Sequence, residues 1–382
     1  MPAYGWTISQ LQRLKYQKQE EDYPIKFEKQ ISVIMPVFNT PVSFLKEAVD
    51  SILTQSFREF EFIIIDDGST DRCREYLESL RDPRIVIIHN ENNQGVTKSL
   101  NIGLRVARGK YIARMDSDDI SLPFRFEKQF TFMENNPDII VCGSKTGAVG
   151  RIRHLSTSKR DHFTDMEEYR IKMLFVNPGP SHPTAFFRHD TLIKYDIWYD
   201  EKLRYAQDYG MWETISHYGD VCILGEVLLL KREHANQITK ASREQQMECD
   251  KITQRKLLTE LMGSVSDEEM DQHYIHSAGR HEDAVITPEI VSWYCQIMKA
   301  NEQRHIYNGR KLRRYIELIE KRLISHTFTK EMSIFEKVGL CYKYLPFSSA
   351  LRITSTTVIK RAHRVFHELT ARVLRSENQI ME

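Results

Sequence analysis

Short apolar runs and amphipathic segments follow one another between residues 31 and 142. The apolar runs are nearly continuous, which is typical of strands covered on both faces. They predict strands at residues 31–38, 60–65, 85–88, 111–115 and 139–142. In the segments between them, apolar residues such as Leu45, Val49 and Ile52 recur at helical spacing. This spacing predicts helices at residues 44–53, 71–80, 96–106 and 123–134.

The alternation of strands and helices with short connections predicts an α/β fold. Right-handed crossovers would build a mostly parallel, Rossmann-like sheet with helices on both faces. Ligands bind at the carboxyl ends of the strands in such sheets. Polar or turn residues follow the predicted strands at positions 38–39, 66–67 and 116–119, and Gly68 permits a tight turn. We therefore expect the functional site at this edge of the sheet.

The alternation of predicted strands and helices becomes less regular after residue 143, and the character of the sequence changes again near residue 240. Segments 184–187 and 221–230 are predicted as strands, and segment 208–218 as a helix. Beyond about residue 240, periodic segments rich in charged residues, Leu and Met continue without a strand pattern. These changes predict an N-terminal extension at residues 1–30, an α/β domain at 31–245 and a helical region at 246–382.

Charge and composition exclude several classes of protein. The formal net charge is only +1, so we expect no nucleic-acid partner. The six cysteines include no Cys-x-x-Cys pair, which is typical of thiols in a reducing, cytoplasmic compartment. The chain has no run of about 18 apolar residues, and its first residues lack the apolar core of a signal peptide. We therefore expect neither a membrane-spanning helix nor secretion.

Three carboxylates follow the predicted strand at residues 111–115, on Asp116, Asp118 and Asp119. Carboxylates this close repel one another unless a cation lies between them. Mn²⁺ and Mg²⁺ prefer oxygen ligands, often one or two carboxylates together with substrate phosphates. Neither G-x-G-x-x-G nor G-x-x-x-x-G-K-[ST] is present, so a bound phosphate would need such a cation. The cluster therefore predicts a Mn²⁺ or Mg²⁺ site, with an acidic turn that caps the next helix as the alternative.

Several segments together resemble a known family. They read ISVIMPVFN, SILTQSF, EFEFIIIDDGSTD, NNQGVTKSLNIGL, GKYIARMDSDD and LPFRFEKQ, and the likeness extends over residues 31–238. They are similar to family 2 glycosyltransferases, inverting enzymes with the GT-A nucleotide-diphospho-sugar transferase fold. The resemblance implies a hexosyltransferase that uses a nucleotide sugar, usually a UDP sugar, in bacterial surface-polysaccharide synthesis. The Gln-x-x-Arg-Trp motif of processive members is absent, which favours transfer of one sugar per encounter.

The resemblance also assigns residues on the donor side. Pro36, Phe38 and Asp67 would line the base and ribose, with Asn39 at the same strand end. Asp116 and Asp118 would form the D-x-D pair, with Asp118 as the direct metal ligand. His234 lies where many GT-A enzymes place a late ligand of the metal or diphosphate. Lys98 is a candidate for a phosphate contact. The alternatives are a helix cap for Asp67, an ordinary loop position for His234 and a solvated position for Lys98.

On the acceptor side, the family has an acidic pair whose aspartate is the catalytic base. The matching positions here are Gln207 and Asp208, so the aspartate is kept and the preceding glutamate is replaced. An attacking hydroxyl is a poor nucleophile and needs such a base. Trp212 is a candidate for stacking on the acceptor. The alternatives are an ordinary helix cap for Asp208 and a core position for Trp212.

The sequence also bears on functions other than sugar transfer. A nucleotidyltransferase needs a glycine-rich basic loop after the first strand, and PVFNTPVS has no Gly, Lys or Arg. A signalling receiver domain begins with the strand that ends in Asp-Asp, whereas here another strand and helix precede it. A catalytically weak or inactive protein that binds nucleotide sugars or glycans stays open because of Gln207.

The expected partners are the nucleotide-sugar donor and a glycan or lipid-linked oligosaccharide acceptor. Residues 341–382 carry seven Lys and Arg against three Glu, and Val358, Ala362, Leu369 and Val373 recur at helical spacing. A basic amphipathic helix suits an anionic membrane surface, so the enzyme could be peripheral on the inner face of the cell membrane. The alternatives are that this stripe packs on the preceding helices or forms a homo-oligomer.

Overall fold

The computed structural model describes residues 26–70, 72–150, 162–163, 165–233, 243–277, 284–327 and 343. The contacts between residues divide the chain into two compact units, one with residues 1–173 and 177–253 and the other with residues 174–176 and 254–382. The division falls inside helix α10 (Arg243–Met262). The domain limits expected from the sequence stay a prediction.

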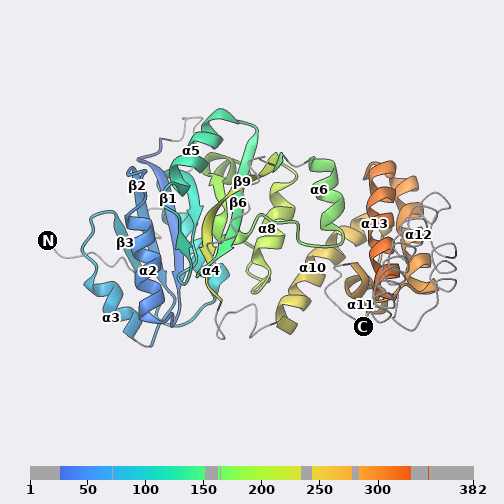
Figure 1. Ribbon diagram of the computed structural model, residues 1–382, viewed down its shortest axis with the longest axis horizontal. Helices are drawn as coiled ribbons and strands as arrows, with labels where there is room; N and C mark the ends of the chain where they lie inside the picture. The colour runs from blue at the N-terminus through green and yellow to red at the C-terminus, as the bar shows by residue number, and fades with distance from the viewer. Residues whose placement is uncertain are drawn as a thin grey trace, which may run out of the picture. The chain divides into compact units, whose positions relative to one another are not determined.

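The first unit is built on a mixed sheet (Figure 1). Its strands lie in the order β3-β2-β1-β4-β8-β6-β9-β5, and β7 pairs with β9. The bounds are β1 Lys29–Val37, β2 Phe60–Asp66, β3 Ile85–His89, β4 Gly109–Arg114, β5 Ile120–Ser121, β6 Ile139–Ala148, β7 His162–Phe163, β8 Phe186–Arg188 and β9 Asp220–Lys231. The five strands predicted before residue 143 are all present.

Strand direction confirms the predicted parallel arrangement for part of the sheet. β3, β2, β1 and β4 pair in parallel, as do β6 and β9. β8 runs antiparallel to both β4 and β6, and so joins the two parallel blocks. β5 and β7 pair antiparallel with β9.

The predicted strand at residues 184–187 is wrong at its start. His182–Thr184 form a short 3₁₀ helix, and β8 begins only at Phe186. Pro183 has no N–H to give to a sheet and suits the first turn of a helix. The Thr184 hydroxyl donates to Ser181 O at 2.7 Å, which closes this turn.

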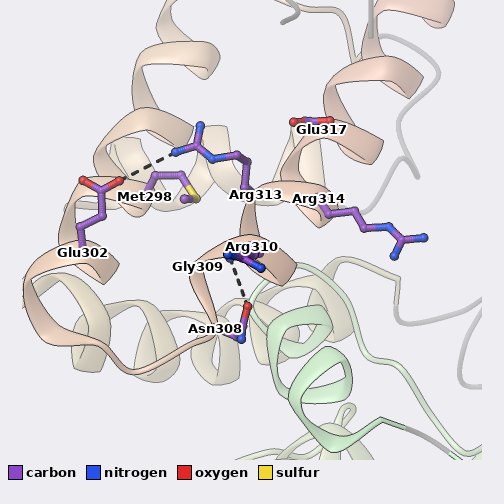
Figure 2. A pocket seen from close by; sticks show the side chains of 8 residues that line it. All are labelled: Met298, Glu302, Asn308, Gly309, Arg310, Arg313, Arg314 and Glu317. Carbon is purple, nitrogen blue, oxygen red and sulfur yellow. Dashed lines mark hydrogen bonds and ion pairs between the residues drawn. The ribbon is translucent and has the colours of Figure 1, made fainter. Parts of the chain in front are cut away.

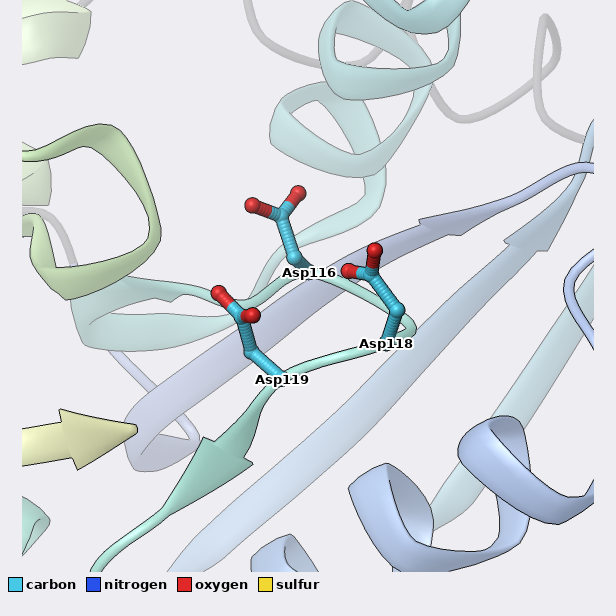
Figure 3. A group of neighbouring side chains, drawn as sticks. All are labelled: Asp116, Asp118 and Asp119. Atoms are coloured by element: carbon cyan, nitrogen blue, oxygen red, sulfur yellow. The ribbon is translucent and has the colours of Figure 1, made fainter. Parts of the chain in front are cut away.

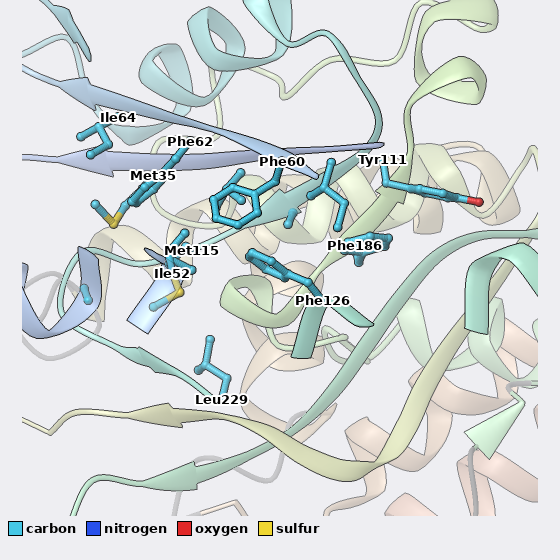
Figure 4. Packing of buried hydrophobic residues seen from close by; sticks show 14 of the residues in the cluster. Met35, Ile52, Phe60, Phe62, Ile64, Tyr111, Met115, Phe126, Phe186 and Leu229 are labelled. Atoms are coloured by element: carbon cyan, nitrogen blue, oxygen red, sulfur yellow. The ribbon is translucent and has the colours of Figure 1, made fainter. Parts of the chain in front are cut away.

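Helices cover both faces of the sheet, as predicted. The bounds are α2 Val42–Leu53, α3 Arg72–Ser79, α4 Val96–Val106, α5 Arg125–Asn135, α6 Met166–Met173, α7 His189–Lys194 and α8 Gln207–Ile215. Met35 of β1 packs in a buried cluster with Ile52 of α2 and Phe126 of α5 (Figure 4). The neighbouring Ile34 points to the other face, where a Cβ on Gly103 of α4 would lie 2.5 Å from it. Gly103 therefore allows α4 to pack closely on β1.

The second unit is helical in the part that the structure describes, which confirms the predicted helical C-terminal region there. It contains the end of α10 together with α11 (Asp267–Ser277), α12 (Pro288–Arg304) and α13 (Gly309–Thr327). Its core is tied by His273, which binds Leu174 O through Nε2 at 2.7 Å and accepts a hydrogen bond from Trp293 Nε1 at 3.0 Å. No helix in the described ranges is both long and apolar enough to cross a membrane. The basic stripe expected at Val358 to Val373 lies outside these ranges.

A cavity of about 570 Å³ lies in this helical unit at the start of α13 (Figure 2). Arg310, Arg313 and Arg314 line it together with Glu302. Arg313 and Glu302 face each other at 3.8 Å, and the Arg310 N–H donates to Asn308 at 3.1 Å. None of the residues that line this cavity is among the predicted site residues.

Candidate active site

The three predicted carboxylates surround one turn between β4 and β5 (Figure 3). One oxygen from each of Asp116, Asp118 and Asp119 lies within 4.8 Å of the others. Asp116 and Asp118 are half-buried, and Asp119 is buried. β5 follows the turn directly, and the next helix has Phe124 at its N-cap without a side-chain bond. The alternative role, an acidic cap for that helix, is therefore wrong.

Asp119 provides a test of whether the cluster fits a cation. Its Oδ1 accepts the Arg232 N–H at 3.0 Å, but its buried Oδ2 has no hydrogen-bond partner in the described part of the chain. Burial and the nearby charges of Asp116 and Asp118 raise the pKa of Asp119 to about 7. A buried, unpartnered carboxylate oxygen beside two other carboxylates is the oxygen-rich environment that Mg²⁺ and Mn²⁺ prefer. The residues of this turn therefore fit a hard divalent cation.

Arg114, the last residue of β4, is a site residue that the sequence analysis missed. Its Nη2 lies 2.6 Å from Asp116 Oδ1, and its side chain is only 6% exposed. Its Nε and Nη1 are buried without a hydrogen-bond partner among the described residues. Burial opposes the charge, but Asp116 outweighs it and raises the pKa of Arg114. The signal in the sequence was a cation two residues before the first carboxylate.

Asp67 fixes the loop that precedes α4. Its Oδ1 accepts hydrogen bonds from Asn90 Nδ2 at 2.7 Å and from the Gln94 N–H at 3.0 Å. Its Oδ2 accepts the Gly95 N–H at 2.8 Å, and Gly95 has a positive φ of 94°. The carboxylate thus holds the loop before α4, rather than the helix directly after it that the sequence suggested as an alternative.

The predicted donor residues of the first strand end lie beside this loop system. Pro36 is half-buried in β1, and Phe38 is 45% exposed just beyond it. Asn39 adopts a positive φ of 46° and links to the next strand end, where its Oδ1 accepts the Thr70 N–H at 2.9 Å. The strand-end loops after β1 and β2 are therefore joined by hydrogen bonds, as their position at one edge of a parallel sheet predicts.

The loop after β1 also contacts the acidic turn. The Thr40 and Ser117 hydroxyls lie 2.7 Å apart, and Ser117 stands between the carboxylates of the turn. Lys98, the remaining donor-side candidate, is exposed on α4. His234 lies outside the described residues.

Asp208 lies in the first turn of α8 and is half-buried. Asn177 Nδ2 donates to its Oδ2 at 3.2 Å, and the Tyr209 N–H donates to its Oδ1 at 2.8 Å. Burial raises the pKa of Asp208, against the opposing effects of these hydrogen bonds and of the Arg114 and Lys231 charges. The N-cap of α8 is Ala206, so the alternative role of Asp208 as an ordinary cap is wrong.

The residues around Asp208 differ in how well they fit their predicted roles. Gln207 is buried, and its Oε1 has no partner in the described part of the chain. Trp212 is fully buried and stacks on Phe187 at 5.7 Å between ring centroids. Since neither face of this indole reaches solvent, the prediction that Trp212 stacks on the acceptor is wrong, and the residue packs in the core.

A buried histidine, His182, contacts Tyr199 and Trp212. His182 Nε2 and the Tyr199 hydroxyl are hydrogen-bonded at 2.8 Å. Burial, with the charges of Arg114 and Lys231, lowers the pKa of His182 well below its usual value, so the ring is neutral. A neutral, satisfied imidazole holds Tyr199 in place. Sequence reasoning had no signal for Tyr199, which follows an irregular loop.

Comparison with known proteins identifies the family. The model of glycosyl transferase family 2 matches residues 32–195. A glycosyltransferase of Haemophilus influenzae is 32% identical over 245 residues, covering 62% of this chain and 75% of the relative. A glycosyltransferase of Methanocaldococcus jannaschii is 37% identical over 190 residues, covering 48% of this chain and 63% of the relative.

Solved structures agree on the fold. S. aureus TarS 1-349 in complex with UDP-GlcNAc gives a TM-score of 0.51 at 21% identity, over 80% of this chain and 94% of that one. A second structure of TarS 1-349 gives 0.50 at 21% identity, over 80% of this chain and 94% of that one. At this identity the likeness concerns the fold alone, and it confirms the predicted GT-A fold. By sequence relatives and fold together, the chain belongs to glycosyltransferase family 2.

Proposed function

We propose that this chain transfers one sugar from a nucleotide-sugar donor, a UDP sugar, to a hydroxyl of a glycan or lipid-linked oligosaccharide, with inversion at the anomeric carbon. The observation that carries the proposal is the acidic turn after β4, where one oxygen from each of Asp116, Asp118 and Asp119 lies within 4.8 Å of the others and the buried Asp119 Oδ2 has no hydrogen-bond partner in the described part of the chain. Displacement of a nucleoside diphosphate requires a cation on the leaving group and a base for the attacking hydroxyl, and Asp208 is the candidate base.

The donor belongs at the strand-end loops. Family membership and the UDP-GlcNAc complex of TarS support a UDP sugar. Phe38 offers an exposed ring for the base, and Pro36 and Asn39 border it. Asp67 would act mainly by holding residues 94–95 in place, since both of its oxygens already accept backbone N–H groups. Lys98, exposed at the start of α4, would contact a phosphate of the donor.

Asp118 and Asp116 would hold a Mn²⁺ or Mg²⁺ ion, with the free oxygen of Asp119 beside them. A divalent cation bound there supplies positive charge to the leaving diphosphate. The residues of the chain itself would perform the other steps of the transfer. The chain must fix the two strand-end loops and take up one proton.

Asp208 would take that proton. Each of its oxygens accepts one hydrogen bond, so each keeps a lone pair for the acceptor hydroxyl. As Asp208 removes the proton, the acceptor oxygen bonds to the anomeric carbon and the bond from that carbon to the diphosphate oxygen breaks. Attack from the face opposite the leaving group inverts the configuration. Burial makes the carboxylate a stronger base than an exposed aspartate.

A direct test is turnover of a panel of UDP sugars with Mn²⁺ and oligosaccharide acceptors, followed by NMR of the product. Inverted anomeric configuration in a UDP-dependent product would support the proposal. A product with retained configuration would contradict direct displacement. Saturable UDP-sugar binding without any transfer or hydrolysis would favour the inactive binding protein, which the replacement at Gln207 keeps as the second candidate.

A further inference from the structure

Asn90 directly follows β3 and is buried, with only 1% of the residue exposed. Its Nδ2 donates to Asp67 Oδ1 at 2.7 Å and, over a longer distance of 3.4 Å, to Ser99 Oγ. Its Oδ1 is buried and has no hydrogen-bond partner among the residues that the structure describes. A buried acceptor without a donor costs free energy, so a folded protein that keeps one needs a reason for it.

The contact with Asp67 determines how the Asn90 amide is oriented. An ionised carboxylate accepts hydrogen bonds and donates none, so the amide nitrogen and not the amide oxygen must face it. Oδ1 is on the other branch of the planar amide and is directed away from Asp67. The free oxygen of Asn90 is therefore an acceptor in a fixed position.

Asp67 itself offers less to a ligand. Its Oδ1 already accepts two hydrogen bonds, from Asn90 Nδ2 and from the Gln94 N–H, and its Oδ2 accepts the Gly95 N–H. A carboxylate oxygen has two lone pairs, so Oδ1 is fully used and Oδ2 keeps one. In contrast, the Asn90 oxygen accepts no hydrogen bond from the described residues and is the better acceptor for a ligand.

The strand register places Asn90 beside the predicted base-binding residues. β1 and β2 pair up to Val37 and Asp66, and Asp66 pairs with the last residue of β3. This ladder extends one residue further, because the Asp67 N–H donates to Val37 O and the Asn90 N–H donates to Asp66 O, both at 2.8 Å. Phe38, Asp67 and Asn90 therefore occupy adjacent register positions at the carboxyl edge of the sheet.

The chemistry of a nucleotide donor supplies the missing hydrogen-bond donor. A base that lies on the exposed ring of Phe38 presents its edge, and not its face, to the neighbouring positions of the row. The edge of uracil carries one N–H, at N3, between two carbonyl groups. Cytosine has a lone pair at N3, so it would place an acceptor against the Asn90 oxygen. An unpaired buried acceptor discriminates strongly against a ligand that lacks the donor.

We infer that Asn90 is a specificity-determining residue for the donor, with its Oδ1 accepting the N3–H of a uracil base, and that Asp67 is the positioning residue that orients this amide. The inference rests on the proposed function for the nature of the donor. It concerns the binding of UDP alone and needs no turnover, so it can fail while the proposed function stands.

The test is calorimetry on the full chain with UDP, N3-methyl-UDP and CDP in the presence of Mn²⁺. In the wild type, N3-methyl-UDP and CDP should each bind about tenfold or more weakly than UDP, because each leaves the buried oxygen without a donor. CDP tests the same position without added bulk. In Asn90→Ala, UDP should weaken by a similar factor, and the preference for UDP over both analogues should largely disappear. The matched control Asn93→Ala changes an exposed asparagine of the same loop and should keep the wild-type preference.

Equal binding of UDP and its two analogues by the wild type would overturn the inference. So would a preference for UDP that is as large in Asn90→Ala as in the wild type. If Asn90→Ala instead removed the effect of a missing 2′-hydroxyl, measured with 2′-deoxy-UDP, while the effect of N3 methylation persisted, Asn90 would bind the ribose and the inference would be wrong. If Asn90→Ala does not fold, Asn90→Ser replaces it in the same comparisons. A wild type that binds no UDP at all would contradict the proposed function as well.

Discussion

The Gly95 N–H donates to Asp67 Oδ2 at 2.8 Å. Asp67 directly follows β2 and Gly95 is the N-cap residue of α4, so this contact fixes the start of α4 to the end of β2. Because Asp67 also accepts from Asn90 and from the Gln94 N–H, its loss leaves three donors without an acceptor. We expect Asp67→Ala to lower the free energy of unfolding by about 1–3 kcal/mol, measured by urea titration. Asp67→Asn keeps one acceptor oxygen and should lose less. Equal stability of Asp67→Ala and wild type would contradict this role.

Asp118 should control metal-dependent donor binding. We expect Asp118→Ala to weaken UDP binding in the presence of Mn²⁺ by about tenfold or more, since removal of even an outer contact of a metal ligand has such effects. Calorimetry with and without Mn²⁺ measures the difference. Asp220→Ala, an exposed aspartate at the start of β9, is the matched control and should bind as wild type does. If Mn²⁺ still enhanced UDP binding in Asp118→Ala, the assignment of Asp118 as a metal ligand would be wrong.

Asp208 should matter for turnover and not for donor affinity. Asp208→Asn is expected to lower kcat by about 10²- to 10⁴-fold, the range for loss of a general base, while the Kd for UDP stays unchanged. Asp190→Asn, in the first turn of α7, offers a control at a similar helix position outside the site. A parallel loss of donor affinity would instead make Asp208 a binding residue.

The raised pKa of Asp208 has a consequence for the pH dependence of turnover. The base works only when ionised, so kcat should fall as the pH drops through the pKa of Asp208. Because burial raises that pKa above the ordinary value for aspartate, the acid limb of kcat should lie above pH 3.8. An acid limb at or below pH 3.8 in the wild type would show that another group limits the reaction.

His273 should make the helical unit sensitive to acid. Burial, against the opposing hydrogen bond to Leu174 O, lowers the pKa of His273 from 6.5 to about 4. Between these values the unfolded state binds more protons, so stability is complete above pH 6.5 and is lost as the pH falls toward 4. The loss is on the order of 3 kcal/mol.

The matched comparison isolates this histidine from other titrating groups. The difference in unfolding free energy between wild type and His273→Gln should shrink as the pH falls from 6.5 to 4, because the glutamine cannot be protonated. Urea titrations at several pH values measure it. A difference that stays constant over this range would mean that His273 is not held neutral by its contacts with Leu174 and Trp293.

The sequence alone was sufficient to predict most helices and strands and the acidic turn. Nearly continuous apolar runs identified the strands from β1 to β4, and the turn residues after them identified the edge of the sheet where Asp116 and Asp118 lie. It also placed Asp208 at the start of a helix. These features depend on burial and on backbone dihedral angles within a few residues, and the spacing of side chains along the chain records both.

Contacts between residues that are distant in the sequence could not be predicted in this way. The antiparallel β8, the burial of Arg114 beside Asp116 and the burial of Trp212 depend on strand order and on contacts between distant segments. Local patterns carry no information on the partner of a charge, because an arginine before an acidic turn reads the same whether it is solvated or buried. The side chain of Arg114 is removed from solvent only when β4 pairs with β1 and β8 in the folded chain.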